Sequence, residues 1–116
     1  MAPQISSKFL NGIIEQNVII GTNCGIGSNV IIKNSIFGNN IMIQDGCKIG
    51  MKGFGFIPIK DKNFKFPHIG RVLVDDNVEI GTDCTIDRGS VDDTEIGKNT
   101  YLDNQVHIAH NVKLGS

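Results

Sequence analysis

Two histidines, His107 and His110, stand three residues apart in the stretch DNQVHIAHN, which covers residues 103 to 111. An imidazole can take up a proton near neutral pH, or it can ligate a metal ion through one ring nitrogen. The spacing is therefore open to three interpretations: two metal ligands, a catalytic base with a bystander, or two surface residues on a scaffold. The repeat that carries them has to be identified first.

A six-residue repeat runs through most of the chain, with an aliphatic residue followed by Gly or by another small or polar residue. From Ile14 the hexads begin IEQNVI, IGTNCG and IGSNVI, and near the C-terminus they end IGKNTY, LDNQVH and IAHNVK. Such hexads resemble the left-handed parallel β-helix of hexapeptide-repeat proteins, in which three hexads form one triangular coil. We therefore predict an all-β fold, with residues 1–116 forming part of one such β-helix domain.

The repeat also predicts which side chains point inward. The first position is aliphatic and the fifth is small or β-branched, so both are expected inside a narrow prism. All three cysteines, Cys24, Cys47 and Cys84, occupy the fifth position, which predicts small buried residues rather than catalytic thiols. The fourth position favours Asn, Gly and Asp, as expected for corners with left-handed backbone angles; its members are Asn17, Asn23, Asn29, Asn40, Gly46, Asn77, Asp83, Asn99 and Asn111.

Two interruptions break the repeat. Residues 51–71 carry four of the six phenylalanines, with β-like runs on both sides of KDKN, and this pattern predicts a hairpin looped out of the coil. Its rings, among them Phe54 and Phe56, either cover an exposed side of the solenoid or contact an apolar substrate tail. The second interruption adds four residues within IDRGSVDDTE, one coil before the histidines.

Within the repeat, His107 takes the sixth position and His110 the third, so neither belongs to the inward-facing set. Counting three hexads back places His110 above Arg88 and beside the four-residue excursion. Some hexapeptide β-helices, the gamma-class carbonic anhydrases, share a zinc ion between histidines of neighbouring subunits. Such a site needs a third histidine at a suitable spacing, whereas His68 lies far back in the hairpin, so no metal site is predicted.

Composition limits the class of partner. Eleven basic and twelve acidic residues nearly cancel, so the chain lacks the basic field that phosphate backbones or anionic membranes attract. No segment has the roughly 18 apolar residues of a spanning helix, and the first residues do not resemble a signal peptide. We expect a cytoplasmic protein with no nucleic-acid partner and no transmembrane segment.

Three segments, IQDGCKIGMKGFGF, IGRVLVDDNVEIGTDCTIDRGSVDDTEIG and LDNQVHIAHNVKLG, together resemble the UDP-3-O-acylglucosamine N-acyltransferases of lipid A biosynthesis. The resemblance is strong from about residue 40 onward. It implies transfer of an (R)-3-hydroxyacyl chain from acyl carrier protein to the 2-amino group of UDP-3-O-acylglucosamine. It implies no cofactor beyond the phosphopantetheine of the carrier protein, and a homotrimer with active sites between neighbouring subunits.

The same resemblance assigns His110, in the motif IAHN, as the general base. An amine that attacks a thioester must lose a proton, and an imidazole can accept it near neutral pH. Asp103 is either a residue that orients this imidazole or an ordinary polar residue of the repeat. Asn104, Phe54 and Phe56 are candidate substrate-binding residues, and His107 is interpreted as a surface bystander.

The chain stops inside a hexad at KLGS, and the family extends further at both ends. We expect a fragment that is weakly active or inactive alone. Fold does not determine function. Two alternatives therefore stay open: an O-acyl or acetyl transferase of the hexapeptide class, and a non-catalytic solenoid that only trimerises.

Overall fold

The computed structural model describes residues 8–9, 13–15, 17–52, 56–59, 62–65 and 70–115, and this part of the chain contains strands and turns but no helix. It accordingly holds no helix long and apolar enough to cross a membrane. In chain order the strands are β1 (Lys8–Phe9), β2 (Ile13–Ile14), β3 (Val18–Ile20), β4 (Gly25–Ile26), β5 (Ile31–Ile32), β6 (Ser35–Phe37), β7 (Met42–Ile43), β8 (Lys48–Met51), β9 (Phe56–Ile59), β10 (Lys62–Lys65), β11 (Val72–Val74), β12 (Glu79–Ile80), β13 (Thr85–Asp87), β14 (Thr94–Ile96), β15 (Tyr101–Leu102), β16 (His107–Ile108) and β17 (Lys113–Leu114).

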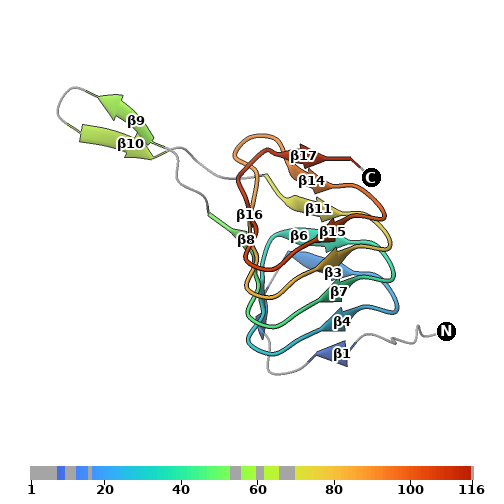
Figure 1. The fold of residues 1–116 in the computed structure, drawn as a ribbon. Coiled ribbons are helices and arrows are strands. Elements are labelled where there is room, and N and C mark those ends of the chain that lie inside the picture. Colours follow the sequence, from blue (N-terminus) through green and yellow to red (C-terminus); the bar gives the residue numbers. More distant parts are fainter. Residues whose placement is uncertain are drawn as a thin grey trace.

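Three parallel sheets of five strands form the three faces of a triangular prism (Figure 1). The first face has the order β1-β4-β7-β12-β15, the second β2-β5-β8-β13-β16 and the third β3-β6-β11-β14-β17. Consecutive strands in the coil lie on different faces, and each strand pairs with the equivalent strand of the next coil. Residues one coil apart therefore stack in columns at the inter-strand spacing of about 4.8 Å.

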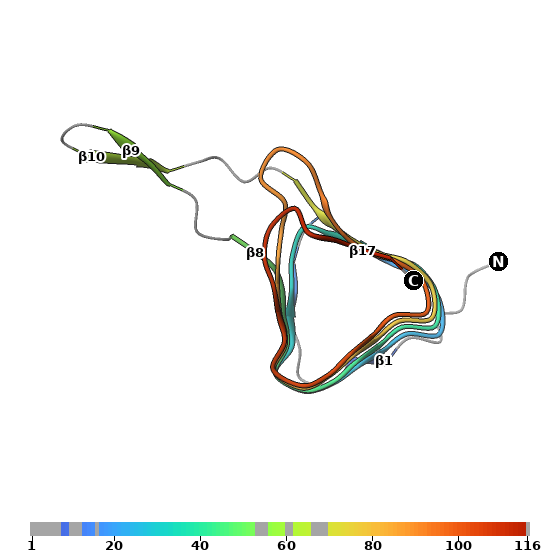
Figure 2. The ribbon, with the colours of Figure 1, turned by 45° about the horizontal axis from the view of Figure 1, so that its top comes forward.

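The coil is left-handed. In Figure 2 the C-terminal coil comes forward, and the chain runs clockwise from the first face to the second and third as it advances. The predicted fold class, a left-handed parallel β-helix, is thereby confirmed.

The corners carry the backbone angles that the fourth hexad position predicted. All nine residues of that position have positive φ, among them Asn29 at 58° and Asn111 at 67°. Asn and Gly tolerate this region better than other residues because a short polar side chain or a missing Cβ lowers its cost. Positive φ is also found at Asn34, Gln105 and Gly50. Together these residues turn the chain from one flat face to the next.

The interior holds the first and fifth positions of the repeat. Ile26, Ile80 and Ile96 from the first position are buried, as are Val30 and Val78 from the fifth. Val106 and Val112, in the last coil, are only half-buried and pack against this core. One continuous column of aliphatic side chains thus supports all three faces.

The looped-out hairpin is present at its predicted place. Strands β9 and β10 pair in antiparallel fashion, with Lys62 opposite Ile59 and Lys65 opposite Phe56, and they project away from the prism (Figure 1). Lys62 and Asn63, which the sequence pattern assigned to the loop, belong to β10. The hairpin leaves the coil after β8 and returns at β11.

The corner between the second and third faces contains a bulge at Gly50. Strand β13 pairs with β8 from Thr85 opposite Lys48 to Ile86 opposite Ile49, and then Asp87 stands opposite Met51. Gly50 is skipped and has a φ of 85°. A Cβ at this position would lie 1.6 Å from the backbone oxygen of Lys33. Only glycine fits, and the bulge sets Asp87 opposite Met51 at the ends of β13 and β8.

Replacement of Gly50 with Ala should destabilise the chain by at least about 2 kcal/mol, because the methyl group meets backbone that cannot give way and φ is unfavourable. Gly115→Ala is the matched control, since nothing lies within 4 Å of the added Cβ; it should change stability by less than about 0.5 kcal/mol. Urea unfolding of both variants measures the difference. Equal stability of the two would contradict the bulge described here.

All three cysteines are buried, as predicted from the fifth position. The Cys47 thiol is fully enclosed and donates to the backbone oxygen of Gly81 at 2.9 Å, and the Cys84 thiol donates to that of Asp103 at 3.0 Å. Burial raises the pKa of Cys47 from its ordinary 9.0 to about 11. A nucleophilic cysteine needs the opposite shift, so Cys47 is a structural residue.

The raised pKa of Cys47 predicts a loss of stability at alkaline pH. Above pH 9 the unfolded chain releases the thiol proton, while the folded chain keeps it up to about pH 11, so proton release favours unfolding in this window. The contribution is at most about 3 kcal/mol. Urea unfolding at pH 8, 9 and 10 should show a steeper decline for the wild type than for Cys47→Ala. Parallel declines would be inconsistent with this assignment.

Candidate functional site

His110 lies in the corner that follows β16, between the second and third faces. The residue is half-buried and its Nδ1 atom is fully enclosed. The corner is formed by residues 33–34, 52, 88–93 and 109–112, and we call it the 2–3 corner. The imidazole therefore has one nitrogen closed to solvent while another part of the ring can meet a ligand.

The register places His110 in the same column as Arg88. Strand β16 pairs with β13 so that His107 stands opposite Thr85 and Ile108 opposite Ile86. His110 follows β16 and Arg88 follows β13, so the two residues lie in neighbouring coils at the same corner. The backbone N–H of Arg88 donates to the oxygen of Met51 at 2.9 Å, which links this column to the next coil.

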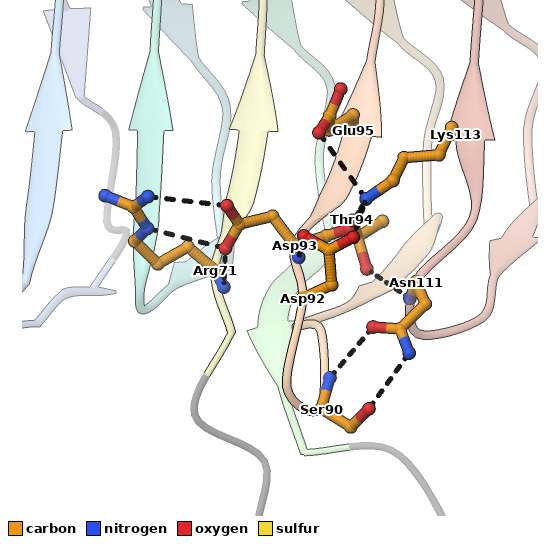
Figure 3. A network of polar contacts seen from close by, with 8 residues as sticks. All are labelled: Arg71, Ser90, Asp92, Asp93, Thr94, Glu95, Asn111 and Lys113. Carbon is orange, nitrogen blue, oxygen red and sulfur yellow. Dashed lines mark hydrogen bonds and ion pairs between the residues drawn. The ribbon is translucent and has the colours of Figure 1, made fainter.

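The four-residue excursion borders the histidine column. Between β13 and β14 the chain bulges outward at the 2–3 corner (Figure 2). Ser90 in this loop donates its N–H to Asn111 Oδ1 at 3.0 Å, and Asn111 Nδ2 donates to Ser90 Oγ at 2.9 Å (Figure 3). The N–H of Asn111 also donates to the hydroxyl of the buried Thr94 at 2.9 Å. Asn111 therefore fixes the excursion beside His110, in addition to forming a corner.

The other end of the excursion is tied to the base of the hairpin and to the last strand. Asp93 accepts the backbone N–H of Arg71 at 2.7 Å and a guanidinium bond at 3.3 Å (Figure 3). The backbone bond, together with this guanidinium, lowers the pKa of Asp93. Lys113 of β17 pairs with Asp92 at 3.2 Å and Glu95 at 3.4 Å. The rim of the site is thus held on both sides.

His107 is paired with a buried carboxylate. Its Nε2 lies 2.9 Å from Oδ2 of Asp87, whose residue is only 7% exposed, while the His107 side chain is 59% exposed. A carboxylate can only accept hydrogen bonds, so the nitrogen that faces it carries the proton. The interpretation of His107 as a surface bystander was incomplete, because it omitted this contact.

Asp103 and Asn104 lie at a different corner. They follow β15 and precede β16, whereas His110 follows β16, so a whole strand of the second face separates them from His110. Asp103 Oδ1 accepts the N–H of Asn104 at 2.8 Å, and Asn104 Oδ1 accepts that of Thr82 at 2.8 Å. Both side chains support the corner between the first and second faces, and within one chain Asp103 does not lie beside His110.

The other predicted site residues are only partly visible. Phe54 and His68 lie outside the described residues, and Phe56 is described as a backbone position in β9. Among the residues that the structure does describe, no group of three His, Cys, Asp or Glu side chains is arranged to hold a metal ion.

Sequence reasoning missed two features of this corner. One is the contact of Asp87 with His107. The other is a group of three cations, Lys33, Lys52 and Arg88, that line a cavity in this corner. The three-hexad count places Asp87 opposite Ala109, so it gave no signal for the contact with His107. The bulge at Gly50, which the hexads do not reveal, limits that count.

Comparison with curated proteins finds several relatives that share the same name. UDP-3-O-acylglucosamine N-acyltransferase from Rhizobium rhizogenes is 49% identical over 92 residues, which is 79% of this chain and 26% of the relative. The proteins of that name from Bradyrhizobium diazoefficiens and Rhodopseudomonas palustris are 47% and 46% identical over 93 and 95 residues. The chain spans about a quarter of the length of these relatives. The resemblance predicted from the motifs is confirmed.

Among solved structures, UDP-N-acetylglucosamine O-acyltransferase (LpxA) from Moraxella catarrhalis is 25% identical to the chain, with a TM-score of 0.48. The match covers 95% of this chain and 47% of that protein. No protein-family model matches the chain.

Replacing His107 with Ala should destabilise the chain by about 1–3 kcal/mol, because the buried Asp87 carboxylate loses its hydrogen-bond donor. His107→Gln is the matched control, since its amide N–H groups can donate to the same carboxylate, and it should cost clearly less. Urea unfolding at neutral pH measures both. An alanine variant as stable as the glutamine variant would show that the contact does not contribute.

Proposed function

We propose that this chain forms part of a UDP-3-O-acylglucosamine N-acyltransferase in which His110 is the general base. The observation that carries the proposal is the position of His110: it is half-buried in the 2–3 corner, in the IAHN motif, with Nδ1 enclosed. The name shared by the relatives supports the substrate class. Because Nδ1 is enclosed, we assign Nε2 as the nitrogen that takes the proton.

In the proposed reaction the 2-amino group of the UDP-linked sugar attacks the carbonyl carbon of an (R)-3-hydroxyacyl thioester. The new C–N bond forms as the C–S bond breaks, and the sulfur leaves as the phosphopantetheine thiol of acyl carrier protein. His110 accepts the proton that the amine loses, and the departing thiolate is protonated in turn. The balance needs no cofactor beyond the donor itself.

An orienting role for Asp103 requires a second copy of the chain, because a strand of the second face separates it from His110 within one copy. We propose a homotrimer in which the 2–3 corner of one chain meets the neighbouring chain near Asp103 and Asn104. The parallel faces offer flat surfaces for such packing. Phe54 and Phe56 are proposed to contact the acyl chain, and the cytoplasm is the proposed location, since acyl carrier protein supplies the donor there.

The proposal predicts that His110→Ala in the complete gene product lowers the rate of N-acylation by about 10²- to 10⁴-fold, the usual contribution of a general base. The KM of the UDP-sugar should change little. The assay uses (R)-3-hydroxyacyl carrier protein and UDP-3-O-acylglucosamine, with product followed by mass spectrometry. His107→Gln is the matched control, because it removes an imidazole three residues away and keeps a donor for Asp87.

Retention of activity in His110→Ala together with its loss in His107→Gln would transfer the role of base to His107. A wild-type protein that accepts a coenzyme A thioester, or that acylates a hydroxyl group, would favour the other hexapeptide transferases. A wild-type protein that forms an oligomer but acylates no acceptor would favour the non-catalytic solenoid.

A further inference from the structure

A cavity of about 270 Å³ opens in the 2–3 corner below His110. Three of the described residues that line it carry a positive charge, and none of them is a carboxylate; these residues are Lys33, Asn34, Gly50, Met51, Lys52 and Arg88. The volume is slightly below that of a pocket for a whole drug-sized ligand, so it suits one charged group of a larger molecule. In a chain with a net charge of −1, three cations around one cavity are a local concentration of charge.

The cavity and His110 share one corner of the coil. The register runs from Ile32 to Ile49, to Ile86 and to Ile108, each pair on neighbouring strands of the second face. The residues that follow these positions form the cavity wall and, at the end, the histidine. With coils about 4.8 Å apart, Arg88 lies one coil below His110 and Lys33 three coils below it, or roughly 5–14 Å along the axis.

Arg88 is the cation placed to bind an anion. It is half-buried, its Nε donates to the backbone oxygen of Gly70 at 2.8 Å, and among the described residues no carboxylate lies within ion-pair distance of its guanidinium. Burial without a carboxylate partner lowers its pKa. Lys52 likewise has no such partner in the described part of the chain, while Lys33 lies 3.7 Å from the exposed Glu15.

We propose that this cavity binds a phosphate or diphosphate group of a substrate whose reacting end lies at His110. A guanidinium offers a planar set of donors that matches phosphate oxygens, and the two lysines add charge at the far end. The amide of Asn34, which donates to the oxygen of Gly50 at 3.3 Å, fixes the cavity wall. The site is separate from the imidazole of His110. It positions the substrate and takes no part in the reaction.

As a part of acyl transfer, this site rests on the proposed function, in which both substrates carry phosphate esters. In a UDP-sugar the β-phosphate lies a few bonds from the 2-amino group, so a phosphate beside Arg88 keeps the amine near His110. In the donor, a long pantetheine arm separates the phosphate from the thioester. The short distance between Arg88 and His110 therefore favours the nucleotide sugar.

The first test measures binding of inorganic pyrophosphate to the complete gene product by isothermal titration calorimetry. Arg88→Ala should weaken binding by at least about tenfold, and Lys33→Ala/Lys52→Ala by about three- to tenfold. Lys98→Ala, an exposed cation outside the cavity, is the matched control and should bind as the wild type does. Circular dichroism and gel filtration establish that each variant keeps its fold and oligomeric state.

Unchanged pyrophosphate affinity in the lysine double variant and in Arg88→Lys or Arg88→Ala would overturn the site. The site would also be overturned if the lysine double variant lost both its affinity and its oligomeric state. In that case the two lysines would contact a second chain rather than an anion. If Arg88→Ala fails to fold, the lysine double variant decides the outcome alone.

The second test separates the two sources of phosphate by steady-state kinetics. If the nucleotide sugar occupies the cavity, the KM of the UDP-sugar should rise about tenfold in Arg88→Lys and Lys33→Ala/Lys52→Ala, with the KM of the donor unchanged. A rise in the donor KM alone would assign the cavity to phosphopantetheine, and unchanged KM values for both would overturn the proposal. A wild-type enzyme without acyl transfer would overturn the proposed function, and the pyrophosphate titration would still decide the site.

Discussion

The stacking of one coil on the next depends on corners that take left-handed backbone angles. Without residues such as Asn29 and Asn111 at positive φ, a six-residue strand unit could not turn onto the next face, and the parallel ladders would lose register. Because most turns use the same hexad position, residues one coil apart come to lie in a straight column. The columns, rather than the single strands, are what assemble a site in this fold.

The 2–3 corner shows how two irregularities convert a column into a site. Gly50 at the bulge shifts Asp87 toward Met51, and the excursion after Arg88 widens the corner. Asn111 then fixes that loop beside His110 through Ser90. The rest of the prism is a regular repeat, so the proposed chemistry lies at the place where the repeat is broken, and hydrogen bonds hold the broken segments in position.

The features that follow from hexad position were predicted from the sequence: the fold class, the corner residues, the inward cysteines and the position of His110 one coil after Arg88. The contact of Asp87 with His107 was not, because the hexad count places Thr85, and not Asp87, opposite His107. The cationic cavity was missed because Lys33, Lys52 and Arg88 are scattered over the chain while its total charge is nearly balanced. Asp103 was considered as a residue that orients His110, and one chain cannot make that contact. The two residues are close in sequence, but they lie at different corners, at opposite ends of β16.

The contact of Asp87 with His107 and the lack of a carboxylate partner for Arg88 among the described residues are connected. Asp87 precedes Arg88 in the sequence, and a carboxylate beside a guanidinium would ordinarily neutralise it. Here Asp87 faces His107 instead, with Nε2 at 2.9 Å, and the guanidinium of Arg88 stays without a carboxylate in the described part of the chain. Strand β13 pairs with β16 so that Thr85 stands opposite His107, and Asp87, two residues further along, reaches the same imidazole. The end of β13 thus directs a carboxylate to a histidine and leaves the next residue, a cation, available to an anion.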